Sequence, residues 1–418
     1  MKKSKLKIPE LMAPAGNWTM LRAAVKSGAD AVYFGIDQFN MRAKAKNFTV
    51  EELKEIVEFC KKNDVKTYLT LNTIIYENEI DQVEKLVNEA KNSGVDMIIC
   101  WDLSVINICR KYDMPFAVST QASVSNSSSA KLYKELGANR VVLARECTLE
   151  DIKKIKTEVD IEIEAFIHGA MCIAVSGRCF MSHELFDKSA NRGECIQPCR
   201  REYEIKDKQT GNEMILGEDY VMSPKDLCTI EFINELIEAD IDSLKIEGRK
   251  RSPEYVAKVV SVYRRAIDLY FANKLTSKIK KELLEELAKV YNRGFSSGFY
   301  FKVPGKNEYV GMYGSKATTR KEFVGRVKNY YKKSSIVEIK IETGKICDKD
   351  KILIIGETTG VVELKIDSIQ LNDIKVNEAE KGNNITIPCN ELVRRNDSVY
   401  IVKQSFSRKG VKHHTTFG

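Results

Sequence analysis

The chain has 418 residues, of which 43% are hydrophobic and 30% are charged, a composition typical of globular rather than disordered proteins. This length exceeds one ordinary hydrophobic core, so we expect two or three domains. No apolar run reaches the roughly 18 residues of a membrane-spanning helix, and the N-terminal stretch MKKSKLKIPELMAPAG has no long apolar segment. We therefore expect no membrane association and a cytoplasmic location.

The charge balance is mildly basic, with 67 Lys and Arg against 59 Asp and Glu and a formal net charge of +8. Such an excess is compatible with an anionic partner, but a solvated surface explains it at least as well. The cysteine count is 11, an odd number, and in a reducing compartment a disulfide framework is not expected. Five cysteines in apolar or strand-like contexts are predicted to be buried hydrophobic residues: Cys60, Cys100, Cys109, Cys347 and Cys389.

Short apolar runs alternate with amphipathic stretches from residue 10 onward, which is the pattern of a parallel α/β sheet. The predicted strands are residues 10–16, 31–35, 66–73, 96–102, 115–121, 140–146, 161–169 and 243–249. The predicted helices are residues 17–28, 49–63, 79–94, 103–112, 127–137, 148–158 and 226–240. Eight strands in this alternation predict a closed (β/α)8 barrel of the TIM type over residues 1–250.

The one long interruption of this pattern is a cysteine-rich insertion at 170–225, directly after the seventh strand. In such barrels the active site is built from loops at the C-terminal ends of the strands, and the insertion begins at one of these ends. Residues 251–320 are predicted to form helices and a Gly- and aromatic-rich segment that packs on the barrel. Alternating β-branched residues predict a small C-terminal β-barrel at 321–405, followed by a tail at 406–418.

Four cysteines of the insertion have the spacing C-x6-C-x15-C-x3-C: Cys172, Cys179, Cys195 and Cys199. Zinc sites usually take pairs separated by two to four residues, and only the second pair has that spacing. The wider first pair favours an iron–sulfur cluster, which is held by four thiolates. Zinc and unrelated or catalytic thiols remain alternatives at this point. Cys228 is a possible substitute ligand, at the start of a predicted helix.

The segments ELMAPAG, GADAVYFG, SGRCFMS and SANRGECIQPCRREY, together with KIEGR and YNRGFSSGFYF, resemble the collagenase-like peptidase family U32. The resemblance covers nearly the whole chain, and these motifs occur in the family's order. Within the family, the chain is most similar to the tRNA hydroxylation proteins of the P type. The ribosomal-RNA cytidine hydroxylation protein is a close second.

The resemblance implies a 4Fe–4S cluster on the four cysteines and an RNA hydroxylase. It implies formation of 5-hydroxyuridine at the wobble position in the anticodon loop of tRNA, with prephenate as the co-substrate. Hydroxylation needs an oxygen source and two electrons, so an electron donor is a possible partner. Because four thiolates leave no iron with an open position, electron transfer is the simpler role for the cluster.

Prephenate is a dicarboxylate, and arginine is the natural side chain to hold a carboxylate. The candidates at strand ends or near the cysteines are Arg42, Arg145, Arg178, Arg192 and Arg249; for each, a structural salt bridge is the alternative. Arg178 is also a catalytic candidate because it precedes Cys179. Asn72, Gln121 and Glu247 end strands and are predicted to bind substrate, or else to pin a loop.

Glu164 and His168 lie on the seventh predicted strand and are catalytic candidates. Residues two apart on a strand share a face, so Glu164, Phe166 and His168 are expected on one side. His168 suits acid–base chemistry, although a hydrogen-bonded core histidine is equally plausible. Candidates for RNA contact are Lys44, Lys46, Arg200, Arg201, residues 249–251, Lys332 and Lys333, with Phe295, Phe299 and Tyr300 as stacking or packing aromatics.

A true peptidase is the competing functional class, as the family name suggests. Peptidases need an activated nucleophile or a metal-bound water. The sequence contains no HExxH, and a Cys–His pair could draw only on His168 or His183 outside the tail. The letters GFSSG at 294–298 do fit G-x-S-x-G. A non-catalytic RNA scaffold is the third class, but a scaffold has no need of four thiolates.

Overall fold

The computed structural model describes residues 6–43, 47–201, 203, 205–206, 208–211, 213–214, 220–305, 308–310 and 314–405. The chain divides into two compact units, each treated separately below. The first contains residues 1–287 and 293–314, and the second contains residues 288–292 and 315–418.

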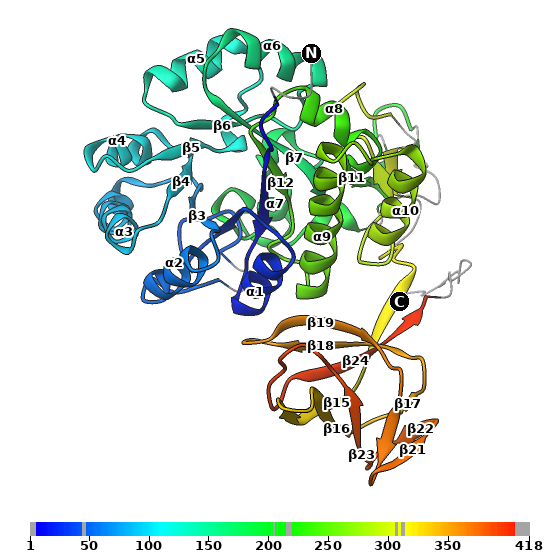
Figure 1. Ribbon diagram of the computed structural model, residues 1–418. Helices are drawn as coiled ribbons and strands as arrows, with labels where there is room; N and C mark the ends of the chain where they lie inside the picture. Colours follow the sequence, from blue (N-terminus) through cyan, green and yellow to red (C-terminus); the bar gives the residue numbers. More distant parts are fainter. Residues whose placement is uncertain are drawn as a thin grey trace. The chain divides into compact units, whose positions relative to one another are not determined.

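The first unit is built on a closed barrel of parallel strands, which confirms the predicted TIM-like fold (Figure 1). Its strands follow chain order, and the last strand pairs with both the first and the seventh, which closes the barrel. The barrel strands are β1 (Glu10–Pro14), β2 (Ala31–Phe34), β3 (Lys66–Leu71), β4 (Met97–Cys100), β5 (Phe116–Val118), β6 (Arg140–Val142), β7 (Glu162–Gly169) and β12 (Ser243–Ile246).

Helices surround these strands, and their ends follow from local capping (Figure 1). Asn17 accepts a hydrogen bond from the Met20 amide at the start of α1, at 3.0 Å. Gly94 adopts the left-handed conformation that ends α3, with φ of 81°. The helices are α1 (Trp18–Lys26), α2 (Leu53–Lys61), α3 (Ile80–Ser93), α4 (Leu103–Lys111), α5 (Ser127–Glu135), α6 (Leu149–Glu158), α7 (Met181–Phe186), α8 (Ile233–Glu238), α9 (Pro253–Phe271) and α10 (Ser277–Leu287). Short 3-10 turns are η2 (Glu77–Glu79), η3 (Thr120–Ala122), η4 (Val175–Gly177), η5 (Ala190–Arg192), η6 (Pro198–Arg200) and η7 (Ile230–Phe232).

The predicted helix at 226–240 is wrong in its first part. Asp226–Cys228 forms strand β11, which pairs antiparallel with the end of β7. The backbone stays extended because it continues the sheet, and the buried Asp226 carboxylate accepts a 3.0 Å hydrogen bond from Nε of Arg293. Sheet pairing and this ion pair outweigh the helical pattern of the local sequence. The remaining short strands of this unit are β8 (Ile205–Lys206), β9 (Glu213–Met214), β10 (Tyr220–Pro224), β13 (Phe295–Ser296) and β14 (Tyr309–Val310).

A register shift between β7 and β12 changes which side chains enter the barrel. Lys245 pairs with Phe166, but the next residue, Ile246, pairs with His168 and skips one position. The extra residue is a β-bulge, which moves His168 to the opposite face from Glu164 and Phe166. The prediction that these three share a face is therefore wrong for His168.

The second unit is antiparallel β structure, as the alternating sequence predicts. Its largest sheet has eight strands in the order β19-β18-β24-β15-β16-β23-β20-β21 around an Ile- and Val-rich core. Its strands are β15 (Thr319–Tyr331), β16 (Ile336–Ile341), β17 (Lys345–Cys347), β18 (Lys351–Gly356), β19 (Gly360–Lys365), β20 (Ile369–Leu371), β21 (Ile374–Val376), β22 (Glu378–Glu380), β23 (Asn384–Pro388) and β24 (Ser398–Gln404).

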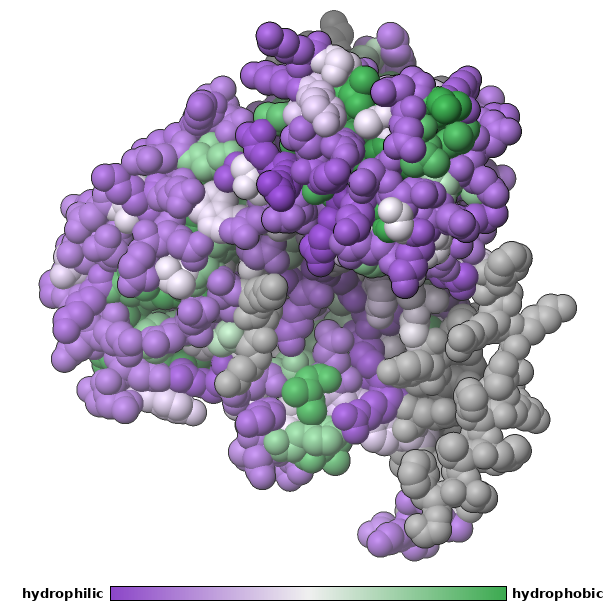
Figure 2. All heavy atoms as spheres, turned by 90° about the horizontal axis from the view of Figure 1, so that it is seen from below, coloured by the Kyte–Doolittle hydropathy of each residue, from purple (hydrophilic) through white to green (hydrophobic). Residues whose placement is uncertain are grey.

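Among the described residues, no helix is both long enough and apolar enough to cross a membrane. The face shown in Figure 2 is mainly hydrophilic, with hydrophobic residues in small groups between charged and polar ones.

Candidate functional site

The lower part of the barrel interior holds a set of buried charges that pair with one another and, at its edge, with the more exposed Glu162 and Lys66. Arg140 is 2% exposed, and its Nη1 lies 2.7 Å from Oε1 of Glu10 and 3.2 Å from Oε2 of Glu164. The other oxygen of Glu164 lies 2.7 Å from Nζ of Lys245. Burial opposes ionisation of Glu10, but the adjacent Arg140 outweighs it and lowers the pKa of Glu10. Sequence reasoning missed Arg140, Glu10 and Lys245, although all three lie within predicted strands, where charged residues are unusual.

The upper part of the interior is a cavity at the C-terminal mouth of the barrel. Five charged side chains line it: Arg42, Arg145, Lys245, Glu247 and Arg249. Oε1 of Glu247 and Nη2 of Arg42 form an ion pair at 3.0 Å. Nη1 of Arg249 donates to Asn40 and Thr70, each at 3.0 Å. The structure therefore brings together three of the five predicted carboxylate-binding arginines.

The mouth cavity has more positive than negative charge. Four lining side chains are cationic and only Glu247 is anionic. Burial raises the pKa of Glu247. The three nearby guanidinium groups of Arg42, Arg145 and Arg249 outweigh this effect and lower the pKa to about 2. Burial lowers the pKa of Arg249 to about 10 and also lowers that of Lys245. Within the described residues, Nε of Arg42 and Nε of Arg145 are buried without a hydrogen-bond partner. Buried cationic donors of this kind favour an anionic ligand.

The four cysteines of the insertion line a second cavity. It shares five wall residues with the mouth cavity: Met41, Arg42, Thr120, Gln121 and Arg145. Burial, and then the nearby thiols of the other three cysteines, raise the pKa of Cys199, while Arg200 lowers it. Because they share this wall, the two cavities adjoin.

The surroundings of the cysteines supply hydrogen-bond donors to sulfur. The Met181 amide donates to Sγ of Cys179 at 3.4 Å, and the Ser182 hydroxyl donates to Sγ of Cys195 at 3.9 Å. Arg200 is half-buried beside Cys172 and Cys199, and its Nε and Nη1 have no hydrogen-bond partner among the described residues. In that same part of the chain, no three His, Cys, Asp or Glu side chains converge on the position of a single metal ion.

Two further predicted arginines fasten the insertion to the barrel instead of lining its mouth. Nε of Arg178 donates to the Gln121 carbonyl at 3.0 Å, and its guanidinium lies 4.9 Å from the Trp101 ring centroid. Nη1 of Arg192 lies 3.0 Å from Oε2 of Glu79. For both residues the structure shows the salt-bridge or packing alternative.

The predicted polar residues divide in the same way. Nδ2 of Asn72 donates to Gln121 at 3.4 Å, and its Oδ1 accepts from the Met41 amide at 3.1 Å. Both Asn72 and Gln121 line the mouth cavity while they pin its loops. Glu164 lies beneath the cavity in the internal charge set.

His168 lies outside the barrel interior. It is 2% exposed, its Nδ1 is 3.3 Å from the Tyr263 hydroxyl, and burial lowers its pKa to about 4. It lines neither of the two cavities. Cys228 pairs in register with His168 and its Sγ lies 3.7 Å from the same hydroxyl, so it does not join the four cysteines. The expectation that Cys228 opens a helix near them is wrong.

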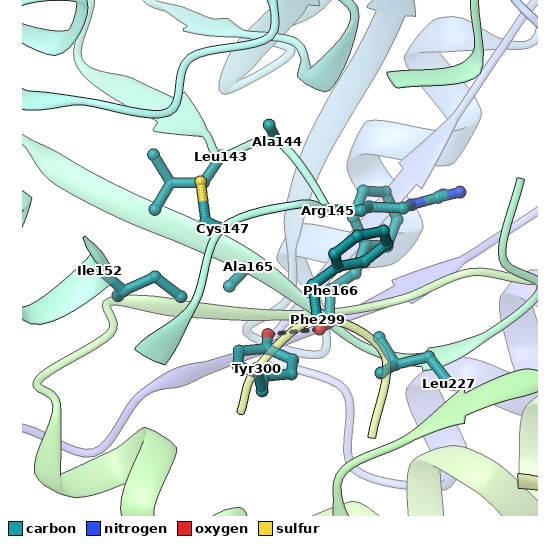
Figure 3. Close-up of a pocket in the computed structure, with 10 residues that line it drawn as sticks. All are labelled: Leu143, Ala144, Arg145, Cys147, Ile152, Ala165, Phe166, Leu227, Phe299 and Tyr300. Atoms are coloured by element: carbon teal, nitrogen blue, oxygen red, sulfur yellow. Dashed lines mark hydrogen bonds between the residues drawn. The ribbon is translucent and has the colours of Figure 1, made fainter. Parts of the chain in front are cut away.

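The aromatic residues proposed for RNA stacking include one that is a core residue. Figure 3 shows Tyr300 directed into a pocket beside Phe166. The Tyr300 hydroxyl donates a 2.7 Å hydrogen bond to the Phe166 carbonyl. The same view shows Arg145 against the Phe166 ring, 4.1 Å from its centroid. Phe295 packs 5.7 Å from the His168 ring. Phe299 lines the same pocket as Tyr300.

The basic residues proposed for RNA contact also have different environments. The guanidinium of Arg201 lies 4.5 Å from the Phe186 ring centroid, and Nζ of Lys250 donates to the Cys195 carbonyl at 2.8 Å. Lys332 and Lys333 are exposed in the second unit. Lys44 and Lys46 lie outside the described residues.

Fold and site together define a TIM-type barrel protein whose mouth adjoins a four-cysteine insertion. The sequence pattern of Peptidase family U32 matches residues 16–309, and the chain belongs to that family. A Porphyromonas gingivalis protein named collagenase is 40% identical over 94% of this chain and 97% of its own length. The Bacillus subtilis tRNA hydroxylation protein P1 is 45% identical over 80% of both chains. The Escherichia coli 23S rRNA 5-hydroxycytidine C2501 synthase is 36% identical over 62% of this chain, but only 39% of its own length is covered.

Proposed function

We propose that this chain is an RNA hydroxylation protein that modifies tRNA, forming 5-hydroxyuridine at the wobble position. The carrying observation is that the four-cysteine cavity and the cationic barrel mouth share one wall. This arrangement offers a redox site beside a substrate site. The likeness to the B. subtilis tRNA hydroxylation protein, over 80% of both chains, supports tRNA as the target. The shorter overlap with the ribosomal-RNA synthase gives less support to that alternative.

We further propose that Cys172, Cys179, Cys195 and Cys199 hold a 4Fe–4S cluster. Such a cluster spreads its thiolates over four irons, so they stand further apart than around one zinc ion. This fits four thiols that line one cavity. The unpartnered donors of Arg200 are suited to an anionic sulfur centre. When bound, the cluster supplies electron transfer.

The mouth cavity is proposed to bind a small dicarboxylate, with prephenate as the candidate co-substrate. Its four cations against one anion can accommodate two further negative charges, and Nε of Arg42 and of Arg145 remain available for carboxylate oxygens. The target base comes from the anticodon loop, where unstacked bases are accessible. Asn72 and Gln121, at the rim, are suited to the polar edge of a base or of the acid.

The collagenase-named relative makes proteolysis the second candidate. A Cys peptidase needs an imidazole next to its nucleophile. His168 faces Tyr263 across the outer side of β7, and its nearest cysteine, Cys228, is 5% exposed. His183 is exposed on α7, and no hydrogen bond joins it to a thiol in the described residues. This geometry favours hydroxylation over proteolysis.

Nucleoside mass spectrometry of tRNA from a deletion strain tests the proposal. Loss of 5-hydroxyuridine, restored by the wild-type gene, is the expected result. Unchanged 5-hydroxyuridine would reject the tRNA function. Complementation with Cys195→Ser should fail, while Cys347→Ser, in the second unit, should restore the modification.

Iron analysis of anaerobically purified protein tests the cluster separately. We expect brown protein with about four irons per chain. The Cys195→Ser variant should lose most of this iron, and Cys228→Ser should keep it. A colourless protein with one zinc would refute the cluster.

A further inference from the structure

Lys245 is a buried lysine at the floor of the mouth cavity. It is 4% exposed, and its Nζ lies 2.7 Å from Oε1 of Glu164. The same Nζ lies 4.3 Å from the centroid of the Tyr33 ring and 5.6 Å from that of Phe166. Aromatic rings and the Glu164 carboxylate are its nearest neighbours, and Glu247 and Arg249 are the other charges that act on it.

A lysine in these surroundings differs from one that only completes a salt bridge. Burial lowers its pKa, which increases the share of the neutral, nucleophilic amine. Glu164 touches Nζ directly, so it can accept the ammonium proton and later return it. The second oxygen of Glu164 is held by Arg140 at 3.2 Å, which fixes the carboxylate in place.

The arginines above Lys245 select the kind of ligand. Arg42, Arg145 and Arg249 line the same cavity and are suited to hold a carboxylate. A carbonyl carbon bonded to that carboxylate would lie below the arginines, on the side of Lys245. We propose that Lys245 forms a Schiff base with a 2-oxo acid whose carboxylate is held by these arginines. This inference rests on the small-acid site of the proposed function, and prephenate is itself a 2-oxo acid.

The reaction is balanced without any further reagent. The Lys245 ammonium gives one proton to Glu164, and the neutral amine adds to the carbonyl carbon. Glu164 returns the proton to the resulting hydroxyl, which leaves as water, and the C=N bond forms with a proton on nitrogen. One C=O bond is exchanged for one C=N bond, one water is released, and no electrons are transferred.

Reductive trapping of the full-length protein tests this inference. The protein is incubated with 2-oxoglutarate and sodium cyanoborohydride, and its intact mass and peptide map are measured. We expect one adduct, on Lys245, with the mass of the acid less one oxygen atom. The matched ligand 2-hydroxyglutarate, which has no carbonyl, should give none.

Variants separate the role of the lysine from that of the fold. Lys245→Arg should reduce the adduct to background, while Lys250→Arg, at the neighbouring cavity, should keep it. Arg145→Gln retains Lys245 and should lower the yield at least tenfold. Because Lys245→Arg could unfold the barrel, the wild-type peptide map is decisive by itself.

Equilibrium dialysis with the same acids distinguishes two failures. If 2-oxoglutarate binds but leaves Lys245 unmodified, the Schiff base is refuted and the acid site stands. If it neither binds nor reacts, both the Schiff base and the proposed acid site are refuted. Equal labelling of Lys245→Arg would also overturn the inference.

Discussion

The lower and upper parts of the barrel interior contain similar residues but differ in how their charges are satisfied. Below, Arg140 is paired by three carboxylates, those of Glu10, Glu162 and Glu164. Above, Arg42 and Arg145 each keep a buried Nε without a partner in the described chain. Removing one member of a fully paired set of buried charges destabilises the fold, because its partner is left buried and unpaired. A buried charge with an unpaired donor can instead bind a ligand. A buried charge by itself therefore does not identify a binding site. Buried donors without a hydrogen-bond partner are the better indicator.

The largest effect should come from breaking the lower set. Arg140→Met leaves Glu10 and Glu164 without their main cation, so we expect a loss of about 3–5 kcal/mol in the free energy of unfolding. Urea denaturation measures it. Arg145→Gln is the matched control at the mouth and should change stability by less than about 1 kcal/mol. Equal losses in the free energy of unfolding of the two variants would contradict the distinction between the lower and upper parts of the barrel interior.

Acid should weaken the upper region through Glu247. Its folded pKa of about 2 lies below the unfolded value of about 4.3, so its stabilisation is present above pH 4.3. That contribution, on the order of 2–3 kcal/mol, is lost as the pH falls through 2. Glu247→Gln should therefore be less stable than wild type at pH 7, by urea denaturation, and the gap should close near pH 2. A gap independent of pH would contradict this assignment.

Ligand affinity should respond to the upper arginines and not to those that fasten the insertion. Arg145→Gln removes a charged hydrogen-bond donor, so binding of a dicarboxylate should weaken by about 1.5–3 kcal/mol, or roughly ten- to hundredfold. Calorimetry with prephenate measures this. Arg192→Gln, whose partner is Glu79, serves as the control and should leave affinity within about twofold. Similar losses in both variants would place the acid elsewhere.

The smallest effect is expected at Tyr300, which sequence reasoning counted among stacking candidates. Tyr300→Phe removes a buried hydrogen bond to the Phe166 carbonyl, so stability should fall by about 1 kcal/mol. RNA affinity in a filter-binding assay should remain unchanged. Weaker RNA binding with unchanged stability would restore the stacking interpretation.

Much of the fold could be predicted because its signals are local. Alternating apolar runs and helix caps defined the barrel strands, and each expected strand is present. The helix predicted at 226–240 failed because β11 pairs with β7, a contact between residues distant in sequence. Residue type likewise identified the arginines, but five candidates had equal claims in the sequence. Folding places Arg42, Arg145 and Arg249 in the mouth, and it binds Arg178 and Arg192 to the loops.

The sequence by itself determined the barrel, the family motifs and the four cysteines, because periodicity and spacing are properties of the chain. Only the tertiary structure decided which side chains face the interior. A single bulge opposite Lys245 and Ile246 turned His168 outward, while Lys245 remained beneath the arginines. The physical reason is that strand faces alternate with every residue, so one inserted residue exchanges inside and outside.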